Sequence, residues 1–205
     1  MQRLESISDF NDILINAVTE ETKINFIRKY FFHGIPYVFK DREQDYFEFR
    51  NRVASNFEIS FHEVFIVGSG KFGFSYIKNT PFTYDSDIDV VLVNESLFDY
   101  YYKKICDYQY QLDSQYKFIS LEEKKDYANF LRYLVKGWMR PDLLPLSFQV
   151  DLLKNDWFKF FKSISYGKSE VGDYKVAGGL YKNYDYLEKY YYINIDSYYN
   201  KLKLG

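Results

Sequence analysis

The sequence predicts an α+β fold in which a small mixed β-sheet is flanked by helices, with helical segments at both ends of the chain. Two short apolar runs, Val64–Val67 and Ile88–Val93, have the length and composition of buried strands. Longer stretches with apolar residues at helical spacing lie before and after these runs. The chain has 205 residues, a length that suits one domain. We therefore expect a single domain over residues 1–205.

Residues 1–60 are expected to form a helical N-terminal segment. Ser8 and Asp9 can cap a helix that runs to about Tyr30. The sequence His33–Pro36 then breaks this helix, because it contains a glycine and a proline. A second helix is predicted over Asp41–Asn56, where charged residues and apolar residues alternate at helical spacing.

Residues 61–180 are expected to form the core that contains the sheet. The Val64–Val67 strand leads into a glycine-rich turn, Gly68–Gly73, and then into a short helix or loop that ends before Pro81. The apolar residues of Ile88–Val93 are nearly continuous, as expected for a strand buried on both faces. The remaining predicted elements are helices at Ser96–Tyr110, Ser120–Lys136 and Asn155–Ile164, short strands at Phe148–Leu153 and Tyr174–Leu180, and a final helix at Asp185–Leu202 within the C-terminal segment 181–205.

Composition narrows the functional classes. Hydrophobic residues make up 47% of the chain and charged residues 27%, which is typical of a folded protein in water. The net charge of -2 gives no global electrostatic case for nucleic-acid binding, although a local basic patch stays open. The single Cys106 excludes an internal disulfide framework and a cysteine-rich zinc site, and the two histidines argue against a His-based site.

Neither a membrane span nor a secretion signal is predicted. No apolar stretch approaches the roughly 20 residues needed to cross a bilayer. Met1–Phe10 carries Glu5 and Asp9 and lacks the apolar segment of a signal peptide. The expected location is therefore the cytoplasm, with no membrane partner.

The stretch Gly68–Gly73 fits the pattern G-x-G-x-x-G after a strand, so a dinucleotide-binding site is the first hypothesis to test. That fingerprint requires a helix that starts at the third glycine and an acidic residue at the end of the next strand. Here Asn79–Pro81 interrupts any such helix, and Asp87 and Asp89 stand at the start of the next strand. The pattern therefore does not favour a dinucleotide site.

A phosphate-binding P-loop is the second hypothesis, because Gly70 and Lys71 stand in a glycine-rich turn. The P-loop motif requires a glycine five residues before the Gly-Lys pair and a Ser or Thr directly after the lysine. Phe65 and Phe72 occupy those two positions. The sequence therefore excludes a P-loop.

The third hypothesis is a metal-assisted phosphoryl-transfer site. Residues two apart on a strand point to the same face, so Asp87 and Asp89 are expected to project together. Two adjacent carboxylates repel unless a cation lies between them, and Mg²⁺ is commonly held by one or two carboxylates together with substrate phosphates. The backbone N–H groups after Gly68 and the Ser69 hydroxyl could hold the terminal phosphates of a nucleoside triphosphate.

These residues form a pattern that resembles the catalytic signature of the polymerase-β-like nucleotidyltransferase superfamily, in particular its minimal bacterial-type domains. The match consists of Gly68, Ser69, Gly73, Ser86, Asp87 and Asp89, within about thirty residues. The resemblance implies transfer of a nucleoside monophosphate from an NTP to an acceptor hydroxyl. It also implies that Asp87 and Asp89 hold two Mg²⁺ ions, or Mn²⁺ in their place, and that Gly68 and Ser69 bind the nucleotide, an ATP in the simplest case.

The superfamily usually supplies a third carboxylate from a later strand, and this sequence offers two candidates. Asp151 is the first choice because apolar residues flank it at strand-like spacing, although it can equally cap the helix that contains Trp157. Asp173 is the second choice. If neither faces Asp87, the enzyme is degenerate or uses an acceptor that needs no protein base.

Basic residues near the turn are candidates for phosphate contact. Lys71 and Lys78 could reach a triphosphate, or they could be solvated surface lysines. Arg132, Lys136 and Arg140 would form a basic stripe if the helix continued through Gly137. That stripe would be either an acceptor-binding edge or the solvated face of a helix.

The resemblance leaves the acceptor open between an RNA end, a protein hydroxyl and a small molecule such as an antibiotic. Many bacterial members act in toxin–antitoxin or phage-defence modules, where a partner protein from the same module is expected. The alternative hypothesis is a non-catalytic nucleotide-sensing or partner-binding subunit on the same fold.

Overall fold

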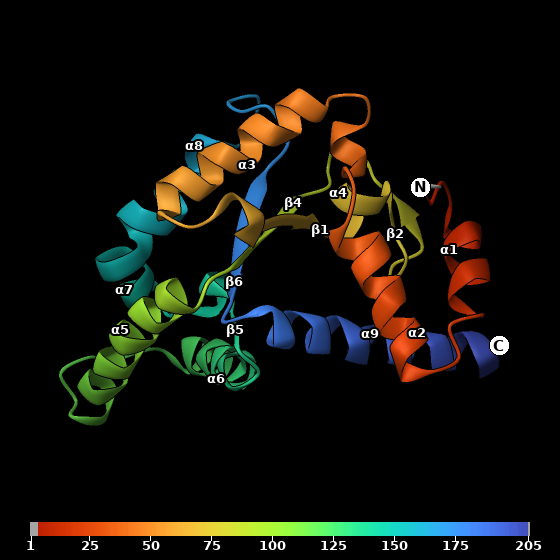
Figure 1. Ribbon diagram of the computed structural model, residues 1–205. Helices are drawn as coiled ribbons and strands as arrows, with labels where there is room; N and C mark the ends of the chain where they lie inside the picture. The colour runs from red at the N-terminus through yellow and green to blue at the C-terminus, as the bar shows by residue number, and fades with distance from the viewer. Residues whose placement is uncertain (1–3, 205) are drawn as a thin grey trace.

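The computed structural model describes residues 4–204, and within that range it leaves out the side chains of residues 150–152, 154 and 155. A four-stranded sheet with the strand order β1-β4-β6-β5 runs through the middle of the molecule (Figure 1). Its strands are β1 (Val64–Val67), β4 (Ile88–Val93), β5 (Trp138–Met139) and β6 (Val176–Tyr181). β4 is antiparallel to β1 and parallel to β6, and β5 is antiparallel to β6. The mixed sheet confirms the predicted α+β class.

Helices cover both faces of this sheet (Figure 1). The helices against one face are α3 (Glu43–Phe57), α5 (Glu95–Asp113), α6 (Leu121–Val135), α7 (Leu146–Phe148), the π-helix Gln149–Phe158 and α8 (Lys159–Ser163). The helices against the other face are α1 (Ile7–Leu14), α2 (Glu20–Ile27), the π-helical turn Arg28–Phe32 and α9 (Tyr184–Leu204). Short 3₁₀ turns at Tyr37–Phe39, Phe61–Glu63 and Pro141–Leu143 connect these elements. A short helix, α4 (Gly68–Phe72), follows β1, and a small two-stranded sheet joins β2 (Phe74–Ser75) to β3 (Thr80–Pro81).

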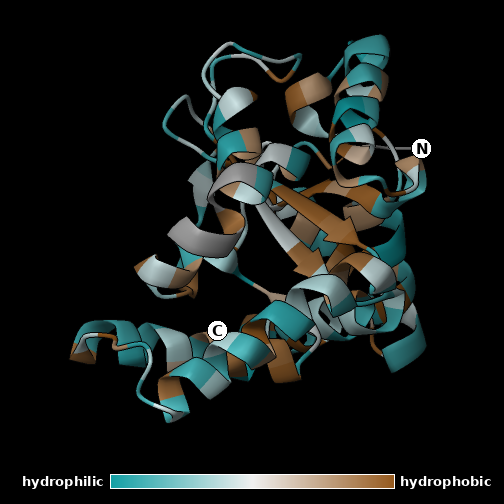
Figure 2. Cartoon of the chain, turned by 90° about the vertical axis from the view of Figure 1, so that its left-hand side faces the viewer, coloured by the Kyte–Doolittle hydropathy of each residue, from teal (hydrophilic) through white to brown (hydrophobic). Residues whose placement is uncertain are grey.

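The sheet separates two hydrophobic cores. On β4, Ile88, Val90 and Leu92 belong to the core beneath α3 and α5, whereas Val91 and Val93 belong to the core beneath α1, α2 and α9. Burial on both faces explains why the apolar run of β4 is nearly continuous. Figure 2 shows the same arrangement, with hydrophobic strands inside and more hydrophilic helices outside. Asp89 is the exception on this strand, because its side chain is exposed.

The predicted helix from Ser8 to Tyr30 is divided into two helices. Ser6, not Ser8, caps α1: its hydroxyl accepts a hydrogen bond from the Asp9 N–H at 3.0 Å. Thr19 adopts an extended backbone conformation and starts α2 with a capping box, in which Thr19 and Thr22 each accept the other's backbone N–H. Because this cap holds Thr19 outside the helical region, the chain turns between α1 and α2.

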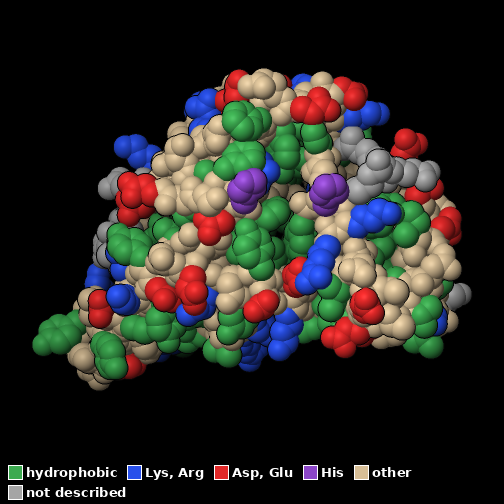
Figure 3. Space-filling view, in the orientation of Figure 1, with side chains coloured by type: hydrophobic (Ala, Val, Ile, Leu, Met, Phe, Trp, Pro, Cys, Tyr) green, Lys and Arg blue, Asp and Glu red, His purple; other side chains and the backbone are tan. Residues whose placement is uncertain are grey.

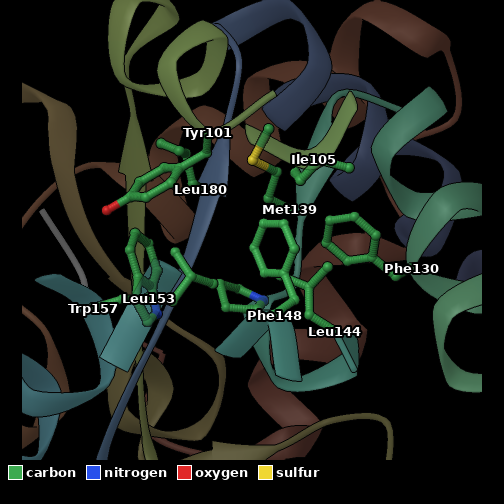
Figure 4. Close-up of a pocket in the computed structure, with 10 residues that line it drawn as sticks. Tyr101, Ile105, Phe130, Met139, Leu144, Phe148, Leu153, Trp157 and Leu180 are labelled. Atoms are coloured by element: carbon green, nitrogen blue, oxygen red, sulfur yellow. The ribbon is translucent and has the colours of Figure 1, made fainter. Parts of the chain in front are cut away.

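The predicted strand at Phe148–Leu153 is wrong, because this segment is helical. Phe148, Leu153, Trp157 and Phe161 are all buried, and their spacing of five, four and four residues matches one side of a π-helix that continues into α8. These side chains meet residues of α5 and α6 in one apolar core, where Phe148, Leu153 and Trp157 lie near Tyr101 and Phe130 (Figure 4). The cavity left in this core is only about 10 Å³, so it has no room for a ligand.

The other long helices and strands are confirmed to within a few residues at their ends, except that the helix predicted at Asn155–Ile164 already begins within the π-helix Gln149–Phe158. The short helix or loop expected before Pro81 is wrong, because the chain there forms the hairpin of β2 and β3, which contains Pro81. In the face shown in Figure 3, acidic and basic side chains are interspersed around hydrophobic side chains that are visible near the middle. Within residues 4–204, no helix combines the length and the apolar character that crossing a bilayer requires.

Candidate functional site

The turn between β1 and α4 brings the backbone against Asp89. β1 and β4 pair so that Val67 lies opposite Asp89, and the chain turns at Gly68 with a φ of 65°. A Cβ atom added to Gly68 would lie 2.7 Å from Oδ2 of Asp89. Glycine is therefore required at position 68 for two reasons: its left-handed backbone conformation and the close approach of a carboxylate oxygen.

Asp87 and Asp89 form the acidic pair that the sequence predicts. Asp87 directly precedes β4 and Asp89 is the second residue of this strand, so the two side chains leave the sheet on the same face. Both residues are exposed, but the protein atoms packed around Asp89 still remove part of the hydration of its carboxylate. This desolvation raises the pKa of Asp89 to about 6, and the negative charge of Asp87 adds to the rise.

A lysine that directly precedes β6 lies beside this pair. β4 and β6 run parallel with Ile88 opposite Val176, and the Ile88 N–H donates to the Lys175 carbonyl at 2.8 Å. This register places Lys175 next to Asp87, and the Lys175 Nζ lies 2.8 Å from Oδ2 of Asp87. The hydrogen bond to Asp87 raises the pKa of Lys175 above its ordinary value. On the same strand, Ala177 is the residue opposite Asp89.

No third acidic side chain joins the pair in the part of the chain that the structure describes. Asp173 is exposed on the loop before β6, and among the described residues no group of three His, Cys, Asp or Glu is placed to hold a metal ion. The side chain of Asp151 lies outside the described residues. The backbone of Asp151 belongs to the π-helix Gln149–Phe158, whose Leu153 and Trp157 pack in the core opposite to the face of Asp89.

Two other positively charged side chains act on Asp89. Lys78 is exposed after β2, and Arg140 follows β5; their charges oppose the rise in the pKa of Asp89. The Arg140 guanidinium also pairs with Asp142 at 2.7 Å and lies 5.6 Å from the ring centroid of Trp138. The site thus combines two carboxylates with three nearby cations, counting Lys175.

Lys71 is not a phosphate ligand in this arrangement. It is buried, and its Nζ donates to the carbonyls of His33 at 2.6 Å and Gly34 at 3.0 Å. A hollow of about 160 Å³ lies beside it, lined by Leu4, Tyr30, His33, Gly34, Ile35, Lys71 and Phe72. Lys71 therefore ties α4 to the turn that follows the π-helical segment Arg28–Phe32.

The predicted basic stripe Arg132, Lys136 and Arg140 is not formed. α6 ends at Val135, and Gly137 turns the chain with a φ of 70°. A Cβ at Gly137 would overlap the ring of Tyr186, so the chain passes close to α9 and turns into β5. Arg140 therefore belongs to the acidic site through β5 and not through a continuous helix.

The other motif residues shape the turns around the site. Gly70 lies against Ile88, since a Cβ there would be 3.2 Å from the Ile88 Cδ1 atom, and this contact seats α4 on β4. The Ser86 hydroxyl accepts the Thr83 N–H at 3.0 Å and closes the turn that leads into Asp87. Ser69 is half-buried at the start of α4. Gly73 has a φ of 86°, and a Cβ there would meet the ring of Tyr37.

The donor chemistry of the pair fits a divalent cation. Asp87 and Asp89 supply hard carboxylate oxygens on one face, and Mg²⁺ is held in proteins by one or two carboxylates plus substrate phosphates. Lys175 already occupies Oδ2 of Asp87. The residues present therefore fit a divalent cation held jointly with a phosphate group.

Comparison with known proteins adds no family assignment, since no protein-family model, curated protein or solved structure significantly matches this chain.

Proposed function

We propose that this protein is a nucleotidyltransferase that moves a nucleoside monophosphate from an NTP to an acceptor hydroxyl. The observation that carries the proposal is the seating of the Asp89 carboxylate against Gly68, with Asp87 beside it on the same face. Two carboxylates thus lie next to a glycine turn, which supports a site for a metal ion and a phosphate group. The Ser69 hydroxyl and the backbone at Gly68 would contact the phosphates.

The proposed reaction is an in-line displacement at the α-phosphorus. The acceptor oxygen bonds to the α-phosphorus, the bond from that phosphorus to the bridging oxygen breaks, and pyrophosphate leaves while the hydroxyl proton passes to water. A divalent cation on Asp87 and Asp89 would, when bound, neutralise phosphate charge and align the reacting groups. Lys78, Lys175 and Arg140 supply further positive charge toward the triphosphate.

The test is transfer of label from NTPs. The protein is incubated with α-phosphate-labelled NTPs, Mg²⁺ or Mn²⁺ and cell extract, and labelled products are separated into RNA, protein and small molecules. We expect labelling by the natural chain and none by Asp87→Ala/Asp89→Ala. Asp85→Ala is the matched control, because Asp85 is an exposed residue of the preceding turn. Equal labelling by the natural chain and the double variant would remove the catalytic assignment.

A second candidate function is nucleotide binding without transfer, in a sensor or partner-binding subunit. Lys175 favours this candidate, because the residue beside Asp87 at the entry to β6 is a lysine and not an acid. This candidate predicts NTP binding without pyrophosphate release, together with a stable complex with a partner protein. Pyrophosphate release above the background of the Asp87→Ala/Asp89→Ala variant would exclude it.

The cellular role follows from the resemblance of the motif and is likewise a proposal. We propose action in the cytoplasm, in a toxin–antitoxin or phage-defence module, on an RNA end, a protein or a small molecule. The distribution of label among these three product classes identifies the acceptor.

A further inference from the structure

Lys175, the residue directly before β6, extends its side chain toward the acidic pair. Residues of β6 that share its face are Ala177 and Gly179, before the buried Tyr181 is reached. A Cβ at Gly179 would lie 2.9 Å from the Trp138 Nε1 atom, so the ring of Trp138 covers that position. Near Asp87 and Asp89, the ammonium group of Lys175 is therefore followed on this face of β6 by two small residues, Ala177 and Gly179.

The ion pair between Lys175 and Asp87 contributes little to folding. Their side chains are 54% and 44% exposed, and exposed ion pairs are weak because water screens them. Lys175 can therefore leave Asp87 at low cost when another cation takes its place. The role of this ion pair is therefore to balance the negative charge of the acidic pair, and it adds little to the stability of the fold.

An ammonium group and a divalent cation compete for the same carboxylate. The Lys175 Nζ lies 2.8 Å from Oδ2 of Asp87. A divalent ion bound to that oxygen would lie close to the ammonium group, and the two positive charges would repel each other strongly. A free divalent ion must therefore displace Lys175 from Asp87 without supplying a new negative group for its ammonium group. An ion that arrives with a triphosphate also brings phosphate oxygens, which can accept the displaced ammonium group.

We propose that Lys175 acts as a resident cation that reserves the site for a metal–triphosphate complex. In the nucleotide-free protein Lys175 neutralises Asp87, and on nucleotide binding its ammonium group moves from Asp87 to a phosphate oxygen. The site then takes a divalent ion together with a nucleotide and binds free divalent ions weakly. This inference rests on the proposed function, since it requires a nucleoside triphosphate at Asp87 and Asp89.

The inference is tested by two binding measurements on the full chain. Free Mn²⁺ binding is followed by electron paramagnetic resonance without nucleotide. Binding of the four α,β-methylene nucleoside triphosphates with Mg²⁺ is followed by calorimetry. In Lys175→Ala and Lys175→Glu, we expect Mn²⁺ affinity to rise about tenfold or more and triphosphate affinity to fall about tenfold. Lys175→Arg, which keeps the charge, should retain triphosphate binding.

Lys182→Ala provides the matched control. Lys182 directly follows β6 and pairs with Asp99 at 3.1 Å, away from the acidic pair. This variant should leave both affinities unchanged. Unchanged affinities in Lys175→Ala and Lys175→Glu, with triphosphate binding by the natural chain, would overturn this inference alone. Failure of the natural chain to bind any of the four analogues would overturn the proposed function and this inference together.

Discussion

At the scale of single residues, Gly68 connects the backbone of the turn after β1 to the carboxylate of Asp89. Gly68→Ala introduces a side chain at a φ of 65° and places its Cβ 2.7 Å from Oδ2 of Asp89. The backbone strain costs about 1 kcal/mol, and the contact displaces Asp89 from the turn. We expect triphosphate affinity, measured by calorimetry, to fall at least about tenfold.

Gly167→Ala separates the two effects of that substitution. Gly167 has a φ of 73°, and a Cβ there would meet nothing within 4 Å. This control should lose about the same stability in urea denaturation and keep its triphosphate affinity. If both variants lose affinity equally, the contact between Gly68 and Asp89 is not what positions the site.

The raised pKa of Asp89 predicts a pH-dependent stability in the metal-free protein. The folded chain holds the proton of Asp89 up to about pH 6, whereas an unfolded aspartate releases it near 3.8. Stability contributed by this group is therefore present at low pH and is lost as the pH rises toward and through 6. Asp89→Asn, which carries no charge, should be more stable than the natural chain at pH 8.

At pH 8 we expect Asp89→Asn to raise the free energy of unfolding by only about 1 kcal/mol, because solvent screens the exposed carboxylate. This corresponds to a rise of roughly 2–4 °C in Tm. Thermal unfolding is measured in EDTA between pH 4 and pH 8. The gain should vanish near pH 4, where the carboxyl of Asp89 is protonated. Asp85→Asn controls for loss of one surface charge. A constant difference between Asp89→Asn and the natural chain across this range would contradict the prediction.

At the scale of secondary-structure elements, the sequence predicts local features better than contacts between distant segments. The predicted helix Ser120–Lys136 is α6, which begins with a capping box in which the Ser120 N–H donates to the Glu123 carboxylate at 2.8 Å. β4 has the predicted bounds Ile88–Val93, because its apolar run is long and well delimited. Such signals lie within a few residues of each other, so one sequence is enough to detect them.

The failures have equally specific causes. Phe148–Leu153 is a short apolar segment in which helix and strand patterns overlap, and the deep burial of Leu153 and Trp157 selects the helix. No strand is predicted at Trp138–Met139, yet it pairs with Tyr181 and Leu180 as a two-residue strand. Asp87 and Asp89 could be found from sequence spacing alone. The position of Lys175 could not, because it depends on the register of two strands that are far apart in the chain.

The contact between α2 and α9 depends on a buried lysine. Lys23 is 5% exposed, and its Nζ lies 2.5 Å from Oδ1 of Asp196 and 4.0 Å from the ring centroid of Tyr199. Removing Asp196 leaves the buried ammonium without its carboxylate, which is costly. Because Asp196 is itself 37% exposed, we expect Asp196→Ala to lower the free energy of unfolding by about 1–3 kcal/mol in urea denaturation.

A double-mutant cycle isolates this interaction. Lys23→Met/Asp196→Ala removes the charge together with its partner, so it should recover much of the stability lost in Asp196→Ala. Glu188→Ala breaks the more exposed pair with Arg28, whose atoms lie 2.6 Å apart, and should cost less. Additive effects of the two single substitutions at positions 23 and 196 would show that the pair is not coupled.

At the scale of the whole molecule, each hydrophobic core contains residues from more than one of the three predicted segments, 1–60, 61–180 and 181–205. One core joins Phe10 and Phe31 near the N-terminus to Val91 of the central sheet and to Leu187 and Tyr199 of α9. Helix α1 and the last turns of α9 accordingly lie on the same side of the molecule in Figure 1. The other core shares the same sheet through Ile88, Val90 and Leu92. Because each core contains residues of β4, we predict that the three segments unfold together.

The chain's two tryptophans allow this prediction to be tested, because Trp157 lies in the core beneath α3 and α5 and Trp138 packs against the core that contains α9. Trp138→Phe leaves Trp157 as the fluorescent reporter of the first core, and Trp157→Phe leaves Trp138 to report on the second. In each variant, urea unfolding is followed by tryptophan fluorescence and by far-ultraviolet circular dichroism. A single cooperative unit requires the two probes to have the same midpoint within each variant, even if the variants differ in stability. Separate midpoints within one variant would mean that the two faces of the sheet unfold independently and that the acidic site lies between two units.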